Sequence, residues 1–443
     1  MEKKLIVGLG ITGKALIRYF SSKGIPCVGF EEISETTFKE CQGELAECYF
    51  GEFPASVWND CDECFISPGV PPTRPWVQEA HKKGIPVTGE LEFASRLLQG
   101  SILAVTGTNG KSTTVSLINE ILKEGGCPSS LKGNIGSPLI TAVTEPPKDY
   151  YVVEVSSYQL ETIRDFHPKI AVILNVTADH LDRYPGMEAY AAAKEAIGKN
   201  QGAGDFLILN ADDPYTAKMA KRSKATVVPF SLVNHQKSGG FVDRDEMVIR
   251  LNEKGGKEMR YRLQEASLQG LHNQENMLAA ILTATLAGVS EKAIGVALKK
   301  FKALRHRLEL SGTWKGIRFY DDSKGTNVGS VVMSLASFDG NVILILGGRD
   351  KGGDYSPLKS LIRHKTKGVI VMGEAKEKIM KEISGEKPFY PVATMQEAVQ
   401  KSFEIGKKGD VVLLSPACSS FDQYKNYAER GDDFKKWARH YGT

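Results

Sequence analysis

Residues 102–126, ILAVTGTNGKSTTVSLINEILKEGG, constrain the fold of this chain more than any other segment. The apolar run 102–105 predicts a buried strand, and apolar residues at helical spacing after Lys111 predict a helix that ends at glycines 125–126. The glycines between strand and helix let backbone N–H groups turn toward a phosphate, and the positive end of the helix completes the anion site. This order of elements predicts a nucleoside triphosphate site in an α/β domain.

The loop is a shortened form of the usual phosphate-binding pattern, because Val105 stands where that pattern has its first glycine. Lys111 can reach the outer phosphates, and the Ser112 hydroxyl can bind Mg²⁺. The alternative is an ordinary strand–helix turn without a ligand, which the match of strand, loop and helix disfavours. The residues expected to contact the nucleotide phosphates are Gly107, Thr108, Asn109, Gly110, Lys111, Ser112 and Thr113.

Length and composition indicate an ordinary globular protein of two to four domains, with 443 residues, 41% of them hydrophobic and 25% charged. The net charge of +4 is too small and too evenly spread to indicate nucleic-acid binding. No apolar run is long enough to span a membrane, and the N-terminal strand lacks a cleavage signal, so we expect no membrane partner and a cytoplasmic location.

The cysteines are expected to be reduced and structural. Seven cysteines without a secretion signal favour free thiols. Cys61 and Cys64 form a single C-x-x-C pair, with Cys41 and Cys48 upstream, but a second such pair is missing from the sequence. Packing is therefore favoured over a metal or redox site.

Residues 1–95 predict a Rossmann-like domain. The motif Gly8-Leu-Gly10-Ile-Thr-Gly13 lies between a strand and a helix, and Glu31 follows about 20 residues later. This fingerprint favours a diphosphate-bearing nucleotide, with a close-packed strand–helix turn as the alternative.

Two further α/β domains are predicted. Residues 96–303 contain the phosphate loop and the strands YYVVEV, AVILNV and DFLILN, followed by a strand-prone part at 226–265. Residues 304–443 contain IRFYDD, NVILILGG, GVIVMG and DVVLLS with helices between them, which is typical of a second doubly wound sheet. Three such domains meeting at clefts indicate an enzyme.

Polar residues at strand ends are candidates for chemistry. Glu154 follows the next strand after the phosphate loop, where it could bind phosphate-bound Mg²⁺ or be a solvated end residue. His180 could be a metal ligand or an acid–base group oriented by Asp179 or Asp182, or a structural histidine. Lys194, in an alanine-rich helix, is interpreted from the sequence alone as facing solvent.

The remaining candidates lie near helix starts. Asn273 and Asn276 could contact an adenine or polar substrate, and helix capping by Asn273 is an equal alternative. In the third domain, the loops 322–327, 346–353 and 415–423 each follow a strand and offer hydroxyls, N–H groups or basic side chains. Their convergence at one sheet edge favours a single anion site.

This set of motifs resembles the Mur ligase family, ATP-dependent amide-forming enzymes that build the peptidoglycan stem peptide. The resemblance covers essentially the whole chain and is carried by GTNGKST, EVSSYQLE, NVTADHLDRYP, HNQEN and RHRLE. In the third domain, DSKGTN, LGGRDKGG and LSPACSSFDQYKNYAERGDDF resemble the branch that adds D-glutamate. The resemblance implies ligation of D-glutamate to UDP-N-acetylmuramoyl-L-alanine through an acyl phosphate, with ATP as co-substrate and two Mg²⁺ ions.

The resemblance also implies residue roles. Lys111, His180 and Lys194 are implied to be catalytic, with Lys194 carbamylated so that its new carboxylate holds Mg²⁺. The implied metal ligands are Ser112, Glu154, His180 and carbamylated Lys194. Nucleotide contacts are implied for Asn273, Arg307, Asp322 and Lys324 in addition to the phosphate loop. The UDP-sugar residues would be Gly10, Ile11, Thr12, Asn134 and Ser156, and the D-glutamate residues Thr326, Lys351, Ser420 and Tyr427.

Three other functions are weighed against this one. Another Mur-type ligase could act on a different amino acid. An NAD-dependent oxidoreductase would explain the first fingerprint but leave the phosphate loop and the three anion loops unexplained. A nucleotide-gated binding protein without turnover is disfavoured by the presence of Glu154, His180 and Lys194 together. We expect a monomer.

Overall fold

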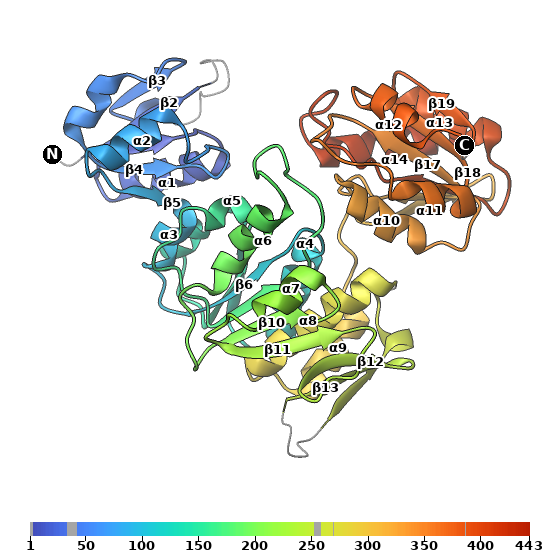
Figure 1. Cartoon of the computed structure of the whole chain (residues 1–443), viewed down its shortest axis with the longest axis horizontal. Helices are drawn as coiled ribbons and strands as arrows, with labels where there is room; N and C mark the ends of the chain where they lie inside the picture. The colour runs from blue at the N-terminus through green and yellow to red at the C-terminus, as the bar shows by residue number, and fades with distance from the viewer. Residues whose placement is uncertain (1–2, 33–41, 252–257, 269, 386) are drawn as a thin grey trace. The chain divides into compact units, whose positions relative to one another are not determined.

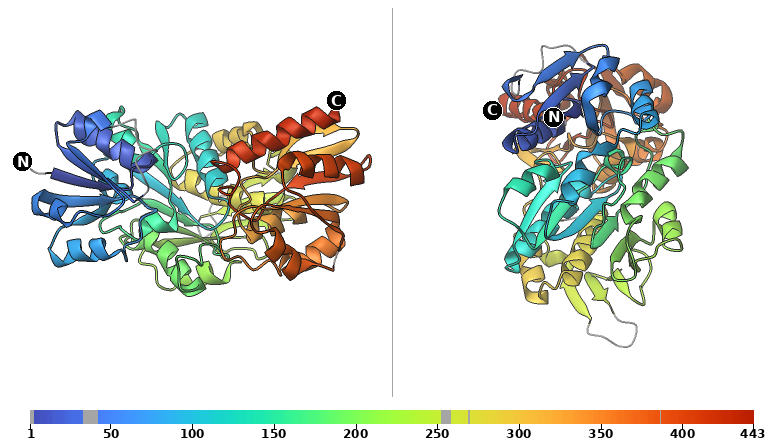
Figure 2. Two further views of the ribbon diagram at one scale, coloured as in Figure 1. Left: turned by 90° about the horizontal axis from the view of Figure 1, so that it is seen from above. Right: turned by 90° about the vertical axis from the view of Figure 1, so that its left-hand side faces the viewer.

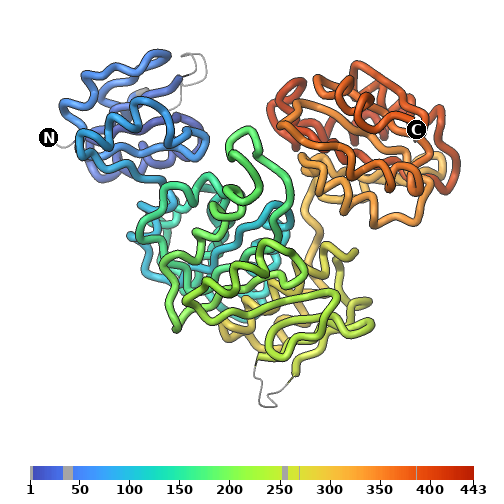
Figure 3. Tube along the Cα trace, in the orientation of Figure 1, coloured from blue at the N-terminus to red at the C-terminus, as the bar shows by residue number. Residues whose placement is uncertain are grey.

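A computed structural model describes residues 3–32, 42–251, 258–268, 270–385 and 387–443 of the chain. Within this part, the strands form three sheets, and each sheet takes its strands from one stretch of the sequence (Figures 1 and 3). Most neighbouring strands in all three sheets are parallel. The prediction of three α/β domains with mainly parallel sheets is confirmed.

The first domain is a five-stranded parallel sheet with helices on both faces (Figure 2). Its elements are β1 (Lys3–Val7), α1 (Ile11–Ser22), β2 (Cys27–Glu31), β3 (Glu47–Phe50), β4 (Cys61–Ile66), α2 (Pro75–Lys82) and β5 (Val87–Gly89). The strand order is β3-β2-β1-β4-β5. A Cβ atom at Gly13 would lie 2.2 Å from the Gly8 carbonyl oxygen, so this glycine allows α1 to pack closely against β1.

The central domain extends one parallel sheet with an antiparallel edge. Its strands are β6 (Ser101–Thr106), β7 (Ser129–Gly133), β8 (Tyr150–Glu154), β9 (Ile170–Ile173), β10 (Phe206–Asn210), β11 (Thr226–Ser231), β12 (Gly239–Asp243), β13 (Glu246–Arg250) and β14 (Met259–Arg262). Strands β12, β13 and β14 pair antiparallel, so the strand-prone part at 226–265 continues the same sheet.

The helices of the central domain are α4 (Lys111–Glu124), α5 (Ser157–Leu160), α6 (Met187–Glu195), α7 (Pro214–Met219), α8 (Leu271–Leu286) and α9 (Glu291–Lys300). The start of α8 corrects one sequence-based hypothesis. Because the helix begins at Leu271, Asn273 lies inside its first turn and does not cap it.

The third domain is a six-stranded sheet with helices on both faces (Figure 2). Its elements are β15 (Glu309–Trp314), β16 (Ile317–Asp321), α10 (Val328–Ala336), β17 (Val342–Gly347), α11 (Leu358–Lys365), β18 (Thr366–Met372), α12 (Lys376–Ile383), β19 (Phe389–Pro391), α13 (Met395–Ile405), β20 (Val411–Leu414) and α14 (Tyr427–Gly442). Helices α10, α11 and α12 bury apolar side chains on one face, and α13 and α14 do so on the other.

Contacts between residues divide the chain into two compact units. The first unit contains Met1–Asn175, Ala191–Ala266 and Glu275–Lys300, and the second contains Val176–Tyr190, Ser267–Gln274 and Phe301–Thr443. Among the described residues, no helix combines the length and apolar character that crossing a bilayer requires.

In the first unit, two buried carboxylates of helix α3 (Glu90–Ser95) contact the central domain. The Glu92 carboxylate accepts backbone N–H groups from Arg164, Asp165 and Phe166. Burial alone would raise the Glu92 pKa, but these donors outweigh it and hold the pKa below its usual range. Glu90 accepts the N–H of Ile140 at 2.6 Å, and burial raises its pKa to about 7. The two carboxylates thereby tie α3 to loops of the central domain.

Glu90 makes the stability of the first unit pH-dependent. A carboxyl group whose pKa is raised in the folded state favours folding when protonated, and this contribution is lost as the pH rises toward about 7. Glu90→Gln stays neutral, so its melting temperature should fall less than that of the wild type between pH 5 and pH 8. The difference in unfolding free energy should reach about 2 kcal/mol.

Calorimetric melting at both pH values tests this, with Glu79→Gln as the matched control. Glu79 is on the surface, where its carboxylate lies 3.7 Å from Lys83. Equal pH dependence in wild type and Glu90→Gln would contradict the assignment.

Candidate functional site

The predicted phosphate loop joins β6 to α4 in the first unit. Its backbone depends on two glycines with positive φ, Gly107 at 148° and Gly110 at 87°. The Lys111 ammonium group donates to the carbonyl oxygens of Gly107 and Thr108 at 2.7 and 2.8 Å. The lysine is thus held over its own loop, on the side where a bound phosphate would meet it.

Two asparagines outside the loop hold its shape. Asn175, after β9, accepts the N–H of Asn109 at 2.9 Å and donates to its carbonyl oxygen at 3.2 Å. Asn276, on α8, accepts a hydrogen bond from the Thr114 hydroxyl at 3.3 Å. A Cβ atom at Gly110 would lie 2.1 Å from the Asn276 amide oxygen. The sequence alone did not connect either asparagine with the loop, because both lie far from it along the chain.

Lys194 is not a solvent-facing lysine, so the interpretation from the sequence alone is wrong. The residue is 1% exposed and is among the largest fully buried side chains of the protein. Its ammonium group donates to the Gly107 carbonyl oxygen at 2.9 Å. Lys194 and Lys111 therefore share one acceptor. Only tertiary packing brings α6 over the phosphate loop, since an alanine-rich helix has no strong sequence signal for which face is buried.

Glu154 is buried at the end of β8, so it is not a solvated strand-end residue. One carboxylate oxygen accepts a hydrogen bond from the Asn134 amide at 2.7 Å. The other oxygen, Oε2, is buried and has no hydrogen-bond partner among the described residues. A buried carboxylate oxygen without a partner is costly, and a hard divalent cation would satisfy it. The donors therefore fit a Mg²⁺ ion at Glu154.

The residues implied to bind the UDP-sugar are divided among three loops of the first unit, with Asn134 directly after β7. Gly10, Ile11 and Thr12 begin α1, and the Ile11 side chain is exposed. Glu31 accepts the N–H of Leu9 at 2.8 Å, so the acidic residue of the fingerprint fixes the glycine loop. Ser156 caps α5 in a capping box with Gln159.

In the second unit, Asp179 contacts one of the candidate D-glutamate residues, Lys351. Its carboxylate accepts from the Lys351 ammonium group and from the Asn327 amide, each at 3.0 Å. Burial opposes ionisation of Asp179, but the charges of Lys351 and His180 outweigh it and lower its pKa. His180 Nε2 lies 3.7 Å from Asp179, and the backbone of His180 has a positive φ of 56°. Of the two acids proposed as partners of His180, Asp179 is in contact.

Asp322 is fully enclosed. Its carboxylate accepts from the hydroxyls of Ser334 and Ser415, both at 2.6 Å, and from the N–H of Leu308 at 3.2 Å. Burial raises its pKa to about 6, although these donors and the Arg307 charge counteract it. Asp322 thus joins three loops: 322–327, 415–423 and the RHRLE segment.

Two of the three anion loops, 322–327 and 415–423, are further connected by α14. Arg430 is buried and donates to the carbonyl oxygens of Ser323, Cys418 and Ser419. The predicted D-glutamate residue Tyr427 begins this helix, and the Lys324 ammonium group lies 4.0 Å from its ring centre. Two other D-glutamate candidates, Thr326 and Ser420, lie in the two loops that Arg430 contacts through Ser323 and Ser419. Ser420 is buried. The sequence analysis did not identify Arg430.

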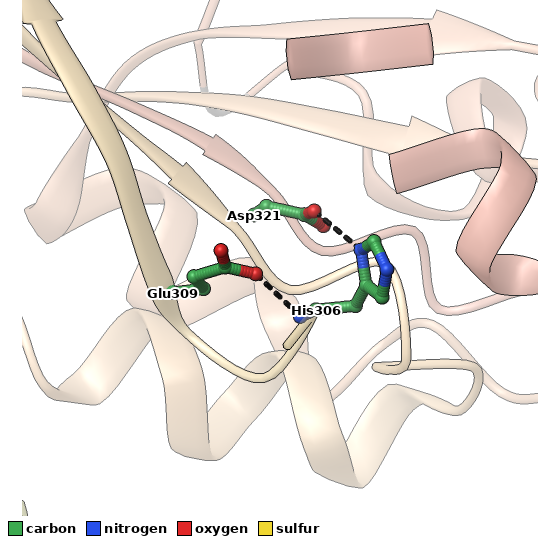
Figure 4. Close-up of side chains that lie close together, drawn as sticks. All are labelled: His306, Glu309 and Asp321. Atoms are coloured by element: carbon green, nitrogen blue, oxygen red, sulfur yellow. Dashed lines mark hydrogen bonds and ion pairs between the residues drawn. The ribbon is translucent and has the colours of Figure 1, made fainter. Parts of the chain in front are cut away.

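His306, Glu309 and Asp321 form the one group of described side chains whose ligand atoms converge as around a metal ion (Figure 4). Asp321 pairs with His306 Nδ1 at 2.7 Å, and Glu309 accepts the His306 N–H at 2.8 Å. The Lys435 ammonium group lies 3.1 Å from Glu309 and 3.3 Å from Asp321. The carboxylates already have a cation between them, so this is an ion-pair cluster.

The cysteines show no metal or redox arrangement in the described part of the chain. Cys64 is in the core, and burial raises the pKa of both Cys61 and Cys64. Cys48 is half-buried, and Cys41 lies outside the described residues. Cys64 belongs to the core cluster of the first domain, and Cys61 packs against it.

Comparison with known proteins identifies the family. Mur ligase models match three consecutive parts of the chain: the MurD-like N-terminal domain at residues 2–89, the middle domain at 105–284 and the glutamate ligase domain at 306–418. The chain belongs to the Mur ligase family.

Full-length relatives agree with this assignment. A Koribacter versatilis protein named UDP-N-acetylmuramoylalanine–D-glutamate ligase is 42% identical, over 99% of this Mur ligase and 97% of the relative. A Geotalea daltonii protein of the same name is 41% identical, over 99% and 97% of the two chains.

Solved structures share the fold at low identity. UDP-N-acetylmuramate–alanine ligase of Thermotoga maritima has a TM-score of 0.62 at 19% identity and covers 100% of both chains. MurF of Acinetobacter baumannii has a TM-score of 0.63 at 16% identity and covers 98% of this Mur ligase and 93% of MurF.

The steric limit at Gly110 gives a test of the phosphate loop in this Mur ligase. Gly110→Ala would force a Cβ atom onto Asn276, so Mg²⁺-ATP affinity should fall by at least about tenfold. Isothermal titration calorimetry with Mg²⁺-ATP measures the change.

Gly126→Ala is the matched control, because Gly126 also has a positive φ, 73°, but no atom within 4 Å of its Cβ position. That variant should lose about 1 kcal/mol of stability and keep its ATP affinity. Equal affinities in all three proteins would rule out a phosphate site at this loop.

Proposed function

We propose that this chain joins D-glutamate to UDP-N-acetylmuramoyl-L-alanine at the expense of ATP, in peptidoglycan synthesis. The observation that supports this most is the full-length similarity, at 42% identity, to a relative named for that reaction. The phosphate loop with its two converging lysines supplies a matching site for the phosphoryl donor. The family motifs extend over all three domains.

The reaction activates a carboxylate. A carboxylate oxygen of the L-alanyl group attacks the γ-phosphorus of ATP, and ADP leaves with the electrons of the broken P–O bond. The acyl phosphate is then attacked by the D-glutamate amine, which loses a proton, and inorganic phosphate leaves as the amide forms. Lys111 stabilises the negative charge on the transferred phosphoryl group, because its ammonium group is held at the loop.

Two Mg²⁺ ions would neutralise the phosphate charge as the anionic substrates are brought together. Ser112, Glu154 and carbamylated Lys194 would hold them in the first unit, and His180 is the candidate ligand in the second. The partnerless Glu154 oxygen supports one of these ions. Carbamylation is supported by the burial of Lys194, because it would convert a buried ammonium group into an anion that can bind a cation.

The substrates are assigned to the three domains. Residues 1–95, with Gly10, Ile11 and Thr12, would bind the UDP-sugar together with Asn134 and Ser156 of the central domain. Residues 96–303 would bind ATP, with Asn273 near its nucleoside. Residues 304–443 would supply Arg307, Asp322 and Lys324 to the nucleotide, with Asp322 at the ribose.

The D-glutamate site would consist of Lys351, Thr326, Ser420 and Tyr427. D-Glutamate has two carboxylates, and an ammonium group with hydroxyl donors is suited to bind them. Arg349, two residues before Lys351, pairs with Glu374 through two hydrogen bonds of 3.0 Å. We further propose that the protein acts as a cytoplasmic monomer.

The function is tested by measuring ADP release with each substrate omitted in turn. Release should require UDP-N-acetylmuramoyl-L-alanine and D-glutamate together, and chromatography should show one amide product. Replacing D-glutamate with L-glutamate, L-lysine or diaminopimelate distinguishes other Mur-type ligases. ADP release that ignores D-glutamate, or hydride transfer to NAD, would contradict the proposal.

Lys194→Ala tests the carbamate. Activity should fall by at least about 100-fold, because a ligand of the second metal ion is lost. Added acetate or propionate should restore part of it by replacing the missing carboxylate. The control is Lys199→Ala. Lys199 lies five residues after Lys194 and is exposed, so the activity of this variant should be unchanged. Full activity of Lys194→Ala without added carboxylate would exclude the carbamate role.

A further inference from the structure

The last helix, α14, places Lys435 between the carboxylates of Glu309 and Asp321, beside the turn at residues 305–309. Lys435 Nζ lies 3.1 Å from Glu309 Oε2 and 3.3 Å from Asp321 Oδ2, and 3.6 Å from Asp432 on its own helix. The Asp321 side chain is 0% exposed and that of Lys435 17%. Pairing at this level of burial is worth more than at the surface, because little water screens it.

These same two carboxylates hold His306 (Figure 4). Glu309 accepts its N–H, and Asp321 accepts from Nδ1 of its ring. The His306 carbonyl oxygen accepts the N–H of Lys324 at 3.1 Å. His306 has a positive φ of 62°, a conformation that a non-glycine residue keeps only when its surroundings enforce it. These three hydrogen bonds are part of the surroundings that hold it.

Helix α14 also contacts the turn through a glycine. A Cβ atom at Gly431 would lie 2.3 Å from His306 Nδ1 and 2.6 Å from Asp321 Oδ2. The helix backbone is therefore packed directly against the His306–Asp321 pair. Gly431 and Lys435 are one helical turn apart, so they reach the same cluster from one face of α14.

We propose that Lys435 is a positioning residue for nucleotide binding: by pairing Glu309 with Asp321, it keeps the turn of His306 in the conformation that presents Arg307. The proposal rests on the proposed function in one respect, namely that Arg307 contacts the nucleotide. Without the ammonium group, the enclosed Asp321 carboxylate would face the half-buried Glu309 carboxylate with no cation between them. The turn would relax away from them, and Arg307 would move with it.

The test is steady-state kinetics of Lys435→Met, with each of the three substrates varied in turn. The KM for ATP should rise by at least about tenfold, because a small displacement of a binding group is sufficient for such a loss. The KM for UDP-N-acetylmuramoyl-L-alanine should change by less than about twofold, since its proposed contacts lie in the first unit. A KM for ATP equal to that of the wild type would overturn the proposal.

Lys436→Met is the matched control. Lys436 is the next residue of α14, is exposed and lies 4.6 Å from the Trp437 ring centre. It should leave all three KM values unchanged. A second variant, Glu309→Gln added to Lys435→Met, should recover part of the ATP affinity, because it removes one of the two facing charges and keeps an acceptor for the His306 N–H. A purely structural defect would not be rescued in this way.

Gly431→Ala keeps the test decisive if Lys435→Met does not fold. It perturbs the same pair without removing a charge, and the folded variant should also have a raised KM for ATP. An unchanged value in folded Gly431→Ala would contradict the proposal. Arg307→Ala distinguishes a failure of the proposed nucleotide contact from a failure of the positioning role of Lys435. If Arg307→Ala leaves the KM for ATP unchanged, the proposed nucleotide contact fails, and if only Arg307→Ala raises it, the role of Lys435 fails.

Discussion

The shared hydrogen-bond acceptor at Gly107 is the interaction on which the catalytic interpretation depends. The ammonium groups of Lys111 and Lys194 both donate to this one carbonyl oxygen, at 2.7 and 2.9 Å. Two cations in a largely buried space repel each other, and a polyanion placed between them relieves that repulsion. Carbamylation of Lys194 would relieve it as well, by replacing one cation with a metal-binding carboxylate. Either change would lower the repulsion between the two ammonium groups at this carbonyl oxygen.

Several loops of the protein owe their shape to buried polar groups. Asn175 and Asn276 fix the phosphate loop. Asp322 joins three segments of the second unit through two hydroxyls and a backbone N–H. Arg430 reaches three carbonyl oxygens on two of the anion loops. Buried polar groups whose hydrogen bonds are made restrict the conformations of the loops that they join.

The sequence predicted those parts of the site that follow strands. Glu154 and the phosphate loop are adjacent to apolar runs with a strong period, and the structure places them at the ends of β8 and β6. Prediction failed where burial depended on a distant partner. Lys194 has no local signal, since its helix is alanine-rich and its acceptor lies 87 residues away. The helix start at Leu271 differs from the capping alternative, which placed Asn273 just before the helix.

By itself, the sequence determined the three α/β domains, the phosphate loop and the family. These depend on local periodicity, on the placement of glycines and on motifs that can be recognised in their order along the chain. Tertiary structure alone decided which charges meet. It placed Lys435 between Glu309 and Asp321, Lys351 against Asp179, and Lys194 beside Lys111 at one carbonyl oxygen. The physical reason is that a charge's effect depends on distance and burial, and both are set by packing between segments that the sequence keeps far apart.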